Sequence, residues 1–209
     1  MFSKNTILTL LGICGFLVVG AVFGLYSKQF YTSPPFEPVP GLLWPNPKQL
    51  TEFQGTDHTG AAFDLHRLRG KWSLLFFGYT HCPDVCPMTL SILSSLQDEL
   101  PEGMQTLFIT VDPGRDTTQR LADYISFYDD RMTGLGGSTE QVSALAAQIG
   151  VAWGHGETMP DGNYIVTHSS AVFLTDPEAR LVGIFSAPLE PDSLLASINR
   201  IRDFVSSQQ

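Results

Sequence analysis

Hydrophobic residues recur along the chain with two periods, one typical of strands and one typical of helices. Nearly continuous apolar runs at residues 73–79 and 105–111 predict two strands that are covered on both faces. Between them, leucines at helical spacing predict a helix over residues 86–100, with one apolar stripe. Strand, helix and strand in this order predict a βαβ unit, in which the two strands run parallel.

Further elements are predicted on both sides of this unit. Before it, residues 53–55 and 62–65 flank a polar, glycine-containing turn and predict a β-hairpin. After it, capping patterns at residues 116–119 and 138–141 predict the first turns of two helices. The second of these helices is expected to stop at Gly150, since glycine commonly ends helices.

The C-terminal third of the chain predicts an antiparallel strand pair and a final helix. Residues 171–175 and 181–186 flank a turn that begins with Asp176-Pro177, and Pro191 opens the helix. The late strands are expected to join the sheet of the βαβ unit. The whole order predicts an α/β protein with a thioredoxin-like fold, which is a central mixed sheet flanked by helices, preceded by an N-terminal β-hairpin.

The N-terminal segment predicts how the protein is anchored. Residues 1–5 form a short tail, and residues 6–27 carry no charge and are long enough to span a hydrocarbon core of about 30 Å. This run is longer than a signal-peptide core and lacks a clear cleavage site, which favours a single uncleaved transmembrane helix. Residues 28–49 are rich in proline and predict a semi-rigid tether. Residues 50–209 then form the thioredoxin-like domain.

Composition narrows the function further. The chain has 209 residues, 43% of them hydrophobic, and a formal net charge of −9. A nucleic-acid partner is excluded because phosphate binding needs clusters of Lys and Arg. Of the three cysteines, Cys14 lies in the apolar N-terminal run, so the domain holds only Cys82 and Cys86. One pair is too few for the disulfide framework of a small secreted domain, which favours a chemical role.

The two cysteines of the domain lie where a buried strand leads into a helix. Free backbone N–H groups and the helix dipole at such a place lower the pKa of a thiol. A separation of four residues allows the two sulfurs to bond each other or to share an ion. Three interpretations stay open: a structural disulfide, a redox-active dithiol with one residue more than the usual C-x-x-C, and a site for Cu(I) or Cu(II).

A histidine would complete a metal site, and His168 is the best placed. It lies just before the strand predicted at residue 171, and in a thioredoxin-like fold the loop that enters this strand lies beside the cysteine loop. The other histidines are expected outside the site because of their positions in a hairpin, beside Cys82 or in a glycine-flanked loop; they are His58, His66, His81 and His155.

Three motifs in order resemble the SCO/SenC family of copper metallochaperones, over about residues 50–205. Residues 78–87, GYTHCPDVCP, resemble the family signature, residues 111–117 its second motif, and His168 with Asp176-Pro177 its third. The resemblance implies that copper is bound by two cysteines and one histidine. These ligands correspond to Cys82, Cys86 and His168, and Asp112 corresponds to the family's aspartate beside the site. Asp112 has an alternative interpretation as a turn residue before Pro113.

The resemblance also implies a location and a partner. The domain is expected in the bacterial periplasm, on the plasma membrane, or in the intermembrane space, on the mitochondrial inner membrane. Its expected role is to deliver copper to the CuA centre of cytochrome c oxidase subunit II, to exchange copper with other carriers, or to reduce the cysteines of that centre. It is thus interpreted as a metallochaperone rather than an enzyme. Alternatives are a thiol–disulfide oxidoreductase, a peroxide-consuming enzyme and a copper or redox sensor.

Two positions depart from the family pattern. Thr167 stands where an acidic residue usually precedes the ligand histidine, and Ala179 stands where the turn often has glycine. Threonine brings no charge, so the hydrogen bonding of the imidazole is expected to differ. Neither departure removes a ligand.

Overall fold

The computed structural model describes residues 17–24, 39–159 and 162–208. The chain divides into two compact units at Pro38. Residues 17–24 are helical. Most of the transmembrane segment predicted at residues 6–27 lies outside the described residues. Among those that are described, no helix is both long and apolar enough to cross a membrane.

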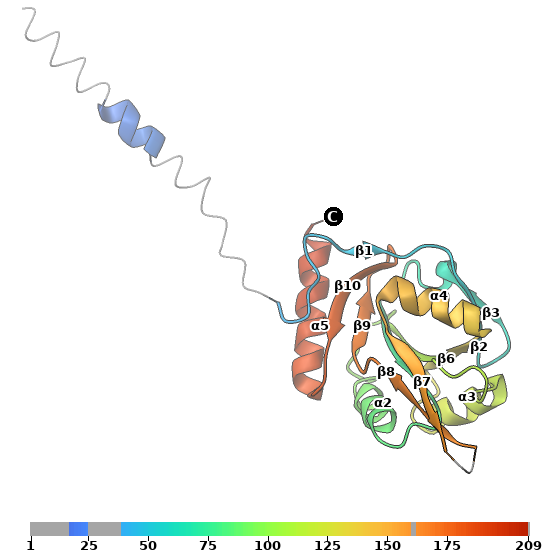
Figure 1. The fold of residues 1–209 in the computed structure, drawn as a ribbon. Coiled ribbons are helices and arrows are strands. Elements are labelled where there is room, and N and C mark those ends of the chain that lie inside the picture. Colours follow the sequence, from blue (N-terminus) through green and yellow to red (C-terminus); the bar gives the residue numbers. More distant parts are fainter. Residues whose placement is uncertain (1–16, 25–38, 160–161, 209) are drawn as a thin grey trace, which may run out of the picture. The chain divides into compact units, whose positions relative to one another are not determined.

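An eight-stranded mixed sheet forms the centre of the domain (Figure 1). Its strands, in spatial order, are β1 (Lys48–Gln49), β10 (Arg180–Phe185), β9 (Val172–Thr175), β4 (Ser73–Gly78), β5 (Gln105–Thr110), β6 (Thr133–Gly136), β2 (Gln54–Asp57) and β3 (Ala62–Asp64). The β4 and β5 strands pair in parallel, whereas β9 pairs antiparallel with β4. The predicted βαβ unit, both hairpins and the thioredoxin-like mixed α/β fold are confirmed.

Four helices and one 3-10 turn complete the described part of the domain. They are η1 (Leu65–Arg67), α2 (Val85–Ser95), α3 (Thr118–Ser126), α4 (Thr139–Ile149) and α5 (Pro191–Ser206). The α4 helix has the predicted capping box at Ser138 and ends at Gly150 in a left-handed conformation. On the sheet, α3 contacts β6, α4 contacts β2 and α5 contacts β10, while α2 and α5 contact each other.

The predictions for α2 and α3 were wrong at one end each. The α2 helix stops at Ser95 instead of Leu100, and the Gln97 side chain donates to the Leu93 carbonyl and to Thr106 on β5. These bonds give the last turn partners outside the helix ladder. The α3 helix is capped by Thr117, not Asp116, because the Asp116 carboxylate is buried elsewhere.

A second, two-stranded sheet was missed. The strands β7 (Trp153–Thr158) and β8 (Tyr164–His168) pair antiparallel with each other. Glycines interrupt the alternation of apolar and polar residues here, so the pattern predicts a loop. His155 accordingly lies in β7, and His168 is the last residue of β8 instead of a loop residue. In Figure 1 the two arrows run down past the ends of the central strands.

The buried central strands fix the place of the segments that carry the candidate site residues. Every residue of β4 is buried, and Phe76 and Phe77 on its two faces contact Phe108 and Phe173 at ring-centroid distances of 6.1 and 6.0 Å. Because β4 and β5 are parallel, their carboxyl ends meet at one edge of the sheet. The segments that follow these two strands therefore lie side by side at that edge.

Candidate metal centre

The two cysteines of the domain flank the turn from β4 into α2. Cys82 is half-buried in the loop, and Cys86 is fully buried in the first turn of the helix. Both are free thiols. The backbone N–H of Cys86 lies 3.4 Å from the Cys82 sulfur and donates to it. This bond is the expected use of a free N–H at the start of a helix.

The surroundings of the two thiols shift their pKa values in opposite directions. The hydrogen bond from the Cys86 thiol lowers the pKa of Cys82 to about 3, helped by the His168 side chain and by backbone N–H groups, although burial opposes the shift. The pKa of Cys86 is raised, first because its thiol donates to Cys82 and second because it is buried. In the metal-free site, Cys82 is therefore the thiolate and Cys86 keeps its proton.

Alkylation by iodoacetamide tests this assignment. Its rate follows the thiolate fraction, which falls as the pH falls through the pKa of the folded protein. An ordinary cysteine, with a pKa of about 8.5, loses more than 99% of its thiolate by pH 6. Because the pKa of Cys82 is lowered, we expect its alkylation rate to change less than about twofold between pH 8 and pH 6. Peptide mapping by mass spectrometry separates Cys82 from Cys14 and Cys86; a tenfold loss per pH unit over that range would contradict the assignment.

Gly78 is required where the buried cysteine meets the sheet. A Cβ atom at Gly78 would lie 2.7 Å from Cε2 of Phe108 and 2.9 Å from the Cys86 sulfur. Both distances are shorter than van der Waals contact, so a larger residue would displace the thiol. The sulfur thus sits against bare backbone at the end of β4.

The variant Gly78→Ala is expected to lower the free energy of unfolding by about 1–3 kcal/mol, the usual cost of overpacking a core. It should also weaken metal binding, since Cys86 has to move. Denaturant unfolding measures the first effect. Gly154→Ala is the matched control, because a Cβ there has no neighbour within 4 Å. Equal stability of the two variants would refute the close packing at Gly78.

His168 brings a nitrogen to the cysteines from β8. Its Nε2 atom lies 3.4 Å from the Cys86 sulfur, and its Nδ1 atom lies 2.8 Å from the Ser169 carbonyl oxygen. A carbonyl can only accept a hydrogen bond, so Nδ1 carries a proton and Nε2 is the nitrogen that faces the sulfurs. The ring is held edge-to-face by Tyr79, at a centroid distance of 5.8 Å. The imidazole therefore presents Nε2 to the sulfurs.

The three side chains form a compact cluster of potential ligands. One ligand atom each from Cys82, Cys86 and His168 lies within 4.8 Å of the other two. A pocket of about 280 Å³ opens over Cys82 and His168 and is lined by Val85 and Ile165, among others. Two thiolate sulfurs are soft ligands that suit copper, and an imidazole nitrogen binds copper as well. The residues present thus fit a three-coordinate copper ion.

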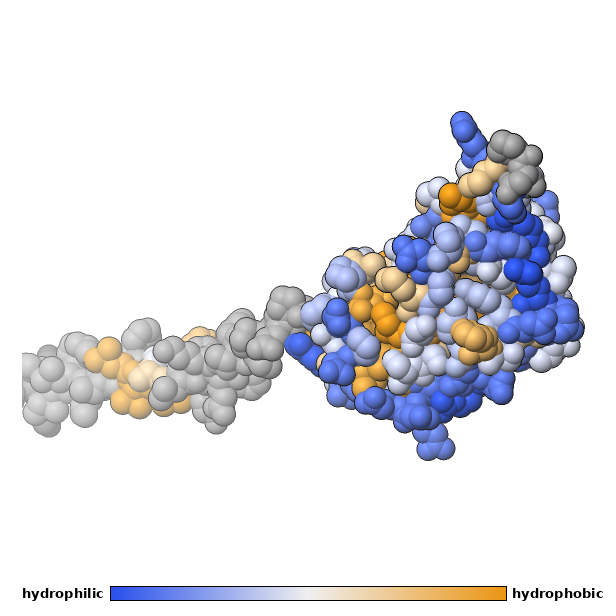
Figure 2. Space-filling model, turned by 90° about the horizontal axis from the view of Figure 1, so that it is seen from below, coloured by the Kyte–Doolittle hydropathy of each residue, from blue (hydrophilic) through white to orange (hydrophobic). Residues whose placement is uncertain are grey.

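The surface around the site mixes apolar and polar side chains. In Figure 2 the face seen from below carries separate orange patches among blue side chains. Exposed apolar residues near the site include Val85 and Met88 of α2 and Ile165 of β8. Apolar side chains beside the site are thus open to solvent.

The remaining histidines lie outside this cluster, as predicted. His58 accepts a hydrogen bond at Nδ1 from the Gly134 backbone. His66 is exposed, and His155 lies against the Tyr164 ring at 4.7 Å. His81 turns away from the sulfurs, with Nδ1 3.6 Å from an Asp116 oxygen.

A second group of potential ligands consists of His81, Asp112 and Asp116. Its carboxylates already have partners. Asp116 accepts from the backbone N–H and the hydroxyl of Thr80, at 3.0 and 2.6 Å, and from Thr110 at 2.6 Å. These bonds tie the start of the cysteine loop to the end of β5. Asp116 is thus a structural residue of the site that the sequence pattern assigned to a helix cap.

Asp112, the residue expected beside the site, is also buried. One carboxylate oxygen accepts from the Tyr164 hydroxyl at 2.7 Å, and the other accepts from Nε of Arg115. The sequence gives no sign of the Tyr164 contact, because β8 is far away in the chain and was not predicted as a strand. The carboxylate therefore faces the hairpin that carries His168.

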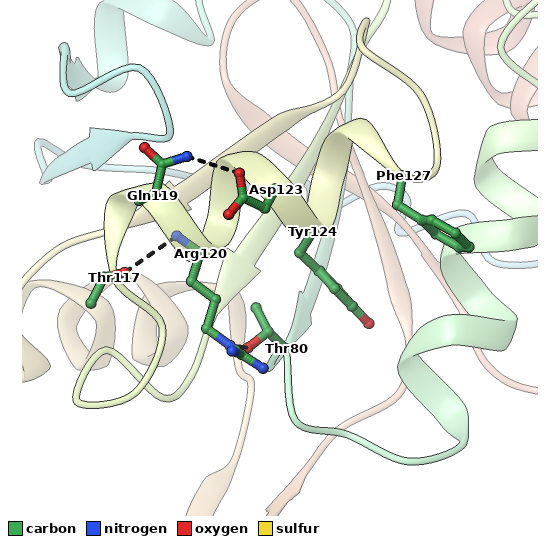
Figure 3. A pocket seen from close by; sticks show the side chains of 7 residues that line it. All are labelled: Thr80, Thr117, Gln119, Arg120, Asp123, Tyr124 and Phe127. Atoms are coloured by element: carbon green, nitrogen blue, oxygen red, sulfur yellow. Dashed lines mark hydrogen bonds between the residues drawn. The ribbon is translucent and has the colours of Figure 1, made fainter.

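A larger pocket, of about 470 Å³, lies on the α3 side of the cysteine loop (Figure 3). Its lining includes Arg120 and Tyr124 of α3 and Phe127 just after this helix, and none of its lining residues is a cysteine or a histidine. Figure 3 shows the Arg120 side chain reaching Thr80, to whose hydroxyl Nε donates at 2.6 Å. Arg120 thus holds the cysteine loop from this side, and the pocket offers no soft metal ligand.

Fold and site together define a class: a thioredoxin-like protein in which a dithiol and an imidazole meet at the carboxyl edge of the sheet. The comparisons with known proteins identify the family. Residues 45–203 match the family model described as SCO1/SenC. The chain belongs to the SCO1/SenC family.

Relatives and solved structures agree with this assignment. A protein of Stutzerimonas stutzeri named as copper-binding is 37% identical over 166 residues, which are 78% of this chain and 81% of that protein. The human mitochondrial SCO1 homologue is 34% identical over 70% of this chain, which spans only 50% of that protein. Copper-bound ScoI of Arabidopsis thaliana superposes with a TM-score of 0.69 and 32% identity, covering 73% of this chain and 97% of that structure.

Proposed function

We propose that this protein is a copper metallochaperone that binds one copper ion through Cys82, Cys86 and His168. The observation that carries this proposal is the convergence of the three ligand atoms within 4.8 Å of one another. Zinc in a closed structural site normally takes four ligands, whereas Cu(I) is well served by two thiolates and one imidazole. The copper-bound structures of other Sco proteins support the same cargo.

The proposed acceptor is the CuA centre of cytochrome c oxidase subunit II, with other copper carriers as donors. Transfer requires each ligand to be replaced in turn by a thiolate or imidazole of the partner. The half-buried Cys82 is the natural first point of exchange, since Cys86 has no exposed surface. We further propose that residues 6–27 anchor the protein in the bacterial plasma membrane, or the mitochondrial inner membrane, with the domain in the periplasm or intermembrane space.

A second candidate function is thiol–disulfide exchange on the cysteines of the acceptor. The different pKa values of the two thiols favour it, because a half-buried thiolate with a buried thiol partner is suited to attack and resolution. Copper loading needs both thiols reduced, so disulfide formation and copper binding exclude each other. A copper or redox sensor would use the same site without an acceptor.

Copper titration of the reduced full chain separates these functions. We expect one equivalent of copper to bind to the reduced protein and none to the protein carrying a Cys82–Cys86 disulfide. Rapid reduction of a protein disulfide by the metal-free protein, together with weak copper binding, would contradict the metallochaperone role and favour the second candidate.

A further inference from the structure

The hairpin that carries His168 is held by side chains. Within the described part of the chain, β7 and β8 pair with each other and not with the central sheet. A strand inside a ladder is fixed by its main-chain hydrogen bonds, but this hairpin lacks such bonds to the sheet beside it. The distance between the His168 imidazole and the cysteines therefore depends on the short connection from His168 to β9 and on the side chains that fasten β8 to the domain.

Arg115 provides the main connection. Its guanidinium lies 3.6 Å above the Tyr164 ring of β8 and 5.8 Å from the Tyr79 ring of the cysteine loop. One flat cation thus contacts an aromatic ring on the hairpin and one on the body of the domain. The side chain is only 18% exposed, which strengthens such cation–π contacts because water is excluded.

Asp112 also takes part in the connection between Arg115 and β8. Its buried carboxylate pairs with Arg115 and accepts from the Tyr164 hydroxyl. It therefore balances the charge of the guanidinium and fixes the ring on which the guanidinium stacks. The Nη2 atom of Arg115 is buried without a hydrogen-bond partner, so this cation is stabilised mainly by Asp112 and the two rings.

Tyr79 connects this cluster to the imidazole. Its hydroxyl accepts a hydrogen bond from the Val166 backbone of β8, and its ring packs edge-to-face against His168. The contacts of β8 with the domain thus continue from Tyr164 through Val166 to His168. Each of these residues is separated from the next by two positions, so they lie on one face of the strand.

We propose that Arg115 is a positioning residue that fixes β8 and thereby holds the His168 imidazole at the thiols. Asp112 acts through the same contact and touches neither sulfur nor imidazole. Arg115 is proposed to hold β8 in the metal-free protein, and only the effect of Arg115 on copper binding rests on the proposed function. Arginine is required because lysine offers a point charge that cannot stack flat between two rings.

Amide hydrogen exchange and NMR of the metal-free full chain test the proposal in Arg115→Lys and Tyr164→Phe. Arg115→Lys keeps the charge, and Tyr164→Phe keeps the ring but loses its bond to Asp112. We expect the amides of β8 to exchange about tenfold faster in Arg115→Lys and less so in Tyr164→Phe. The ring signals of His168 should shift in both variants, because its packing against Tyr79 changes.

Ile198→Val is the matched control. Ile198 is fully buried on α5, so shortening it destabilises the whole domain without touching the hairpin. Local opening of β8 and the His168 signals should then stay as in the wild type. If Arg115→Lys and Tyr164→Phe both behave like this control, the positioning role is refuted.

Copper titration then links the hairpin to the site. Arg115→Lys should weaken Cu(II) about tenfold while changing Cu(I) little, since Cu(II) depends more on the imidazole. If wild-type protein binds no copper, the proposed function fails, but the exchange and NMR data still decide the role of Arg115. If the wild type binds copper and Arg115→Lys leaves the Cu(II) affinity unchanged, the link from hairpin to site is refuted.

Discussion

Replacing Cys86 by serine is expected to abolish tight Cu(I) binding, with a loss of affinity of about three orders of magnitude or more, equivalent to about 4 kcal/mol. The hydroxyl of serine is a hard, neutral ligand, so the ion would keep one thiolate and one imidazole. The Cys86 sulfur also lies 3.4 Å from the His168 nitrogen, and its thiol donates a hydrogen bond to the Cys82 sulfur. Competition with a chromogenic Cu(I) chelator measures the affinity.

Cys14→Ser is the matched control for this variant. It makes the same chemical change at the third cysteine, which lies in the apolar N-terminal run. Its Cu(I) affinity should equal that of the wild type. If Cys86→Ser binds Cu(I) as tightly as Cys14→Ser, the dithiol is not the copper site.

Replacing His168 by alanine is expected to separate the two oxidation states of copper. Cu(II) prefers nitrogen ligands more than Cu(I) does, so its affinity should fall about 100-fold while that of Cu(I) falls less than about tenfold. The absorption band of sulfur-to-Cu(II) charge transfer should shift or disappear. Titration of each ion, followed by absorption spectroscopy, gives both results.

His66→Ala controls for the general loss of a histidine. His66 is exposed and lies in the η1 turn, away from the site. It should bind both ions like the wild type. Equal retention of Cu(II) and Cu(I) by His168→Ala would remove this residue from the ligand set.

Much of the fold could be predicted because its core elements have clear patterns. Continuous apolar runs indicate β4 and β5, and the Ser138 capping box and Gly150 bound α4 in the structure as in the sequence. The ends of α2 and α3 could not be predicted, because they depend on Gln97 and Asp116 finding partners on β5 and its neighbours. Such contacts are tertiary and leave no local periodicity.

The site divides in the same way. The motif around Cys82 and Cys86 indicates that the two thiols lie at the start of a helix and that they can bind a metal or react. The family resemblance indicates His168 as the third ligand. The geometry that brings His168 to the thiols could not be predicted, since the β7–β8 hairpin is rich in glycine and gives no strand pattern. The Arg115–Tyr164 contact joins segments about 50 residues apart and is visible only in the fold.

Copper-edge X-ray absorption of the Cu(I)-loaded full chain shows whether Cys82, Cys86 and His168 bind one ion together, because it counts the atoms bound to the metal. We expect the copper to be bound to two sulfurs and to one nitrogen with the scattering pattern of an imidazole. The nitrogen should be lost in His168→Ala, and one sulfur in Cys82→Ser. A wild-type spectrum with a single sulfur, or without the imidazole pattern, would show that these three side chains do not bind copper together.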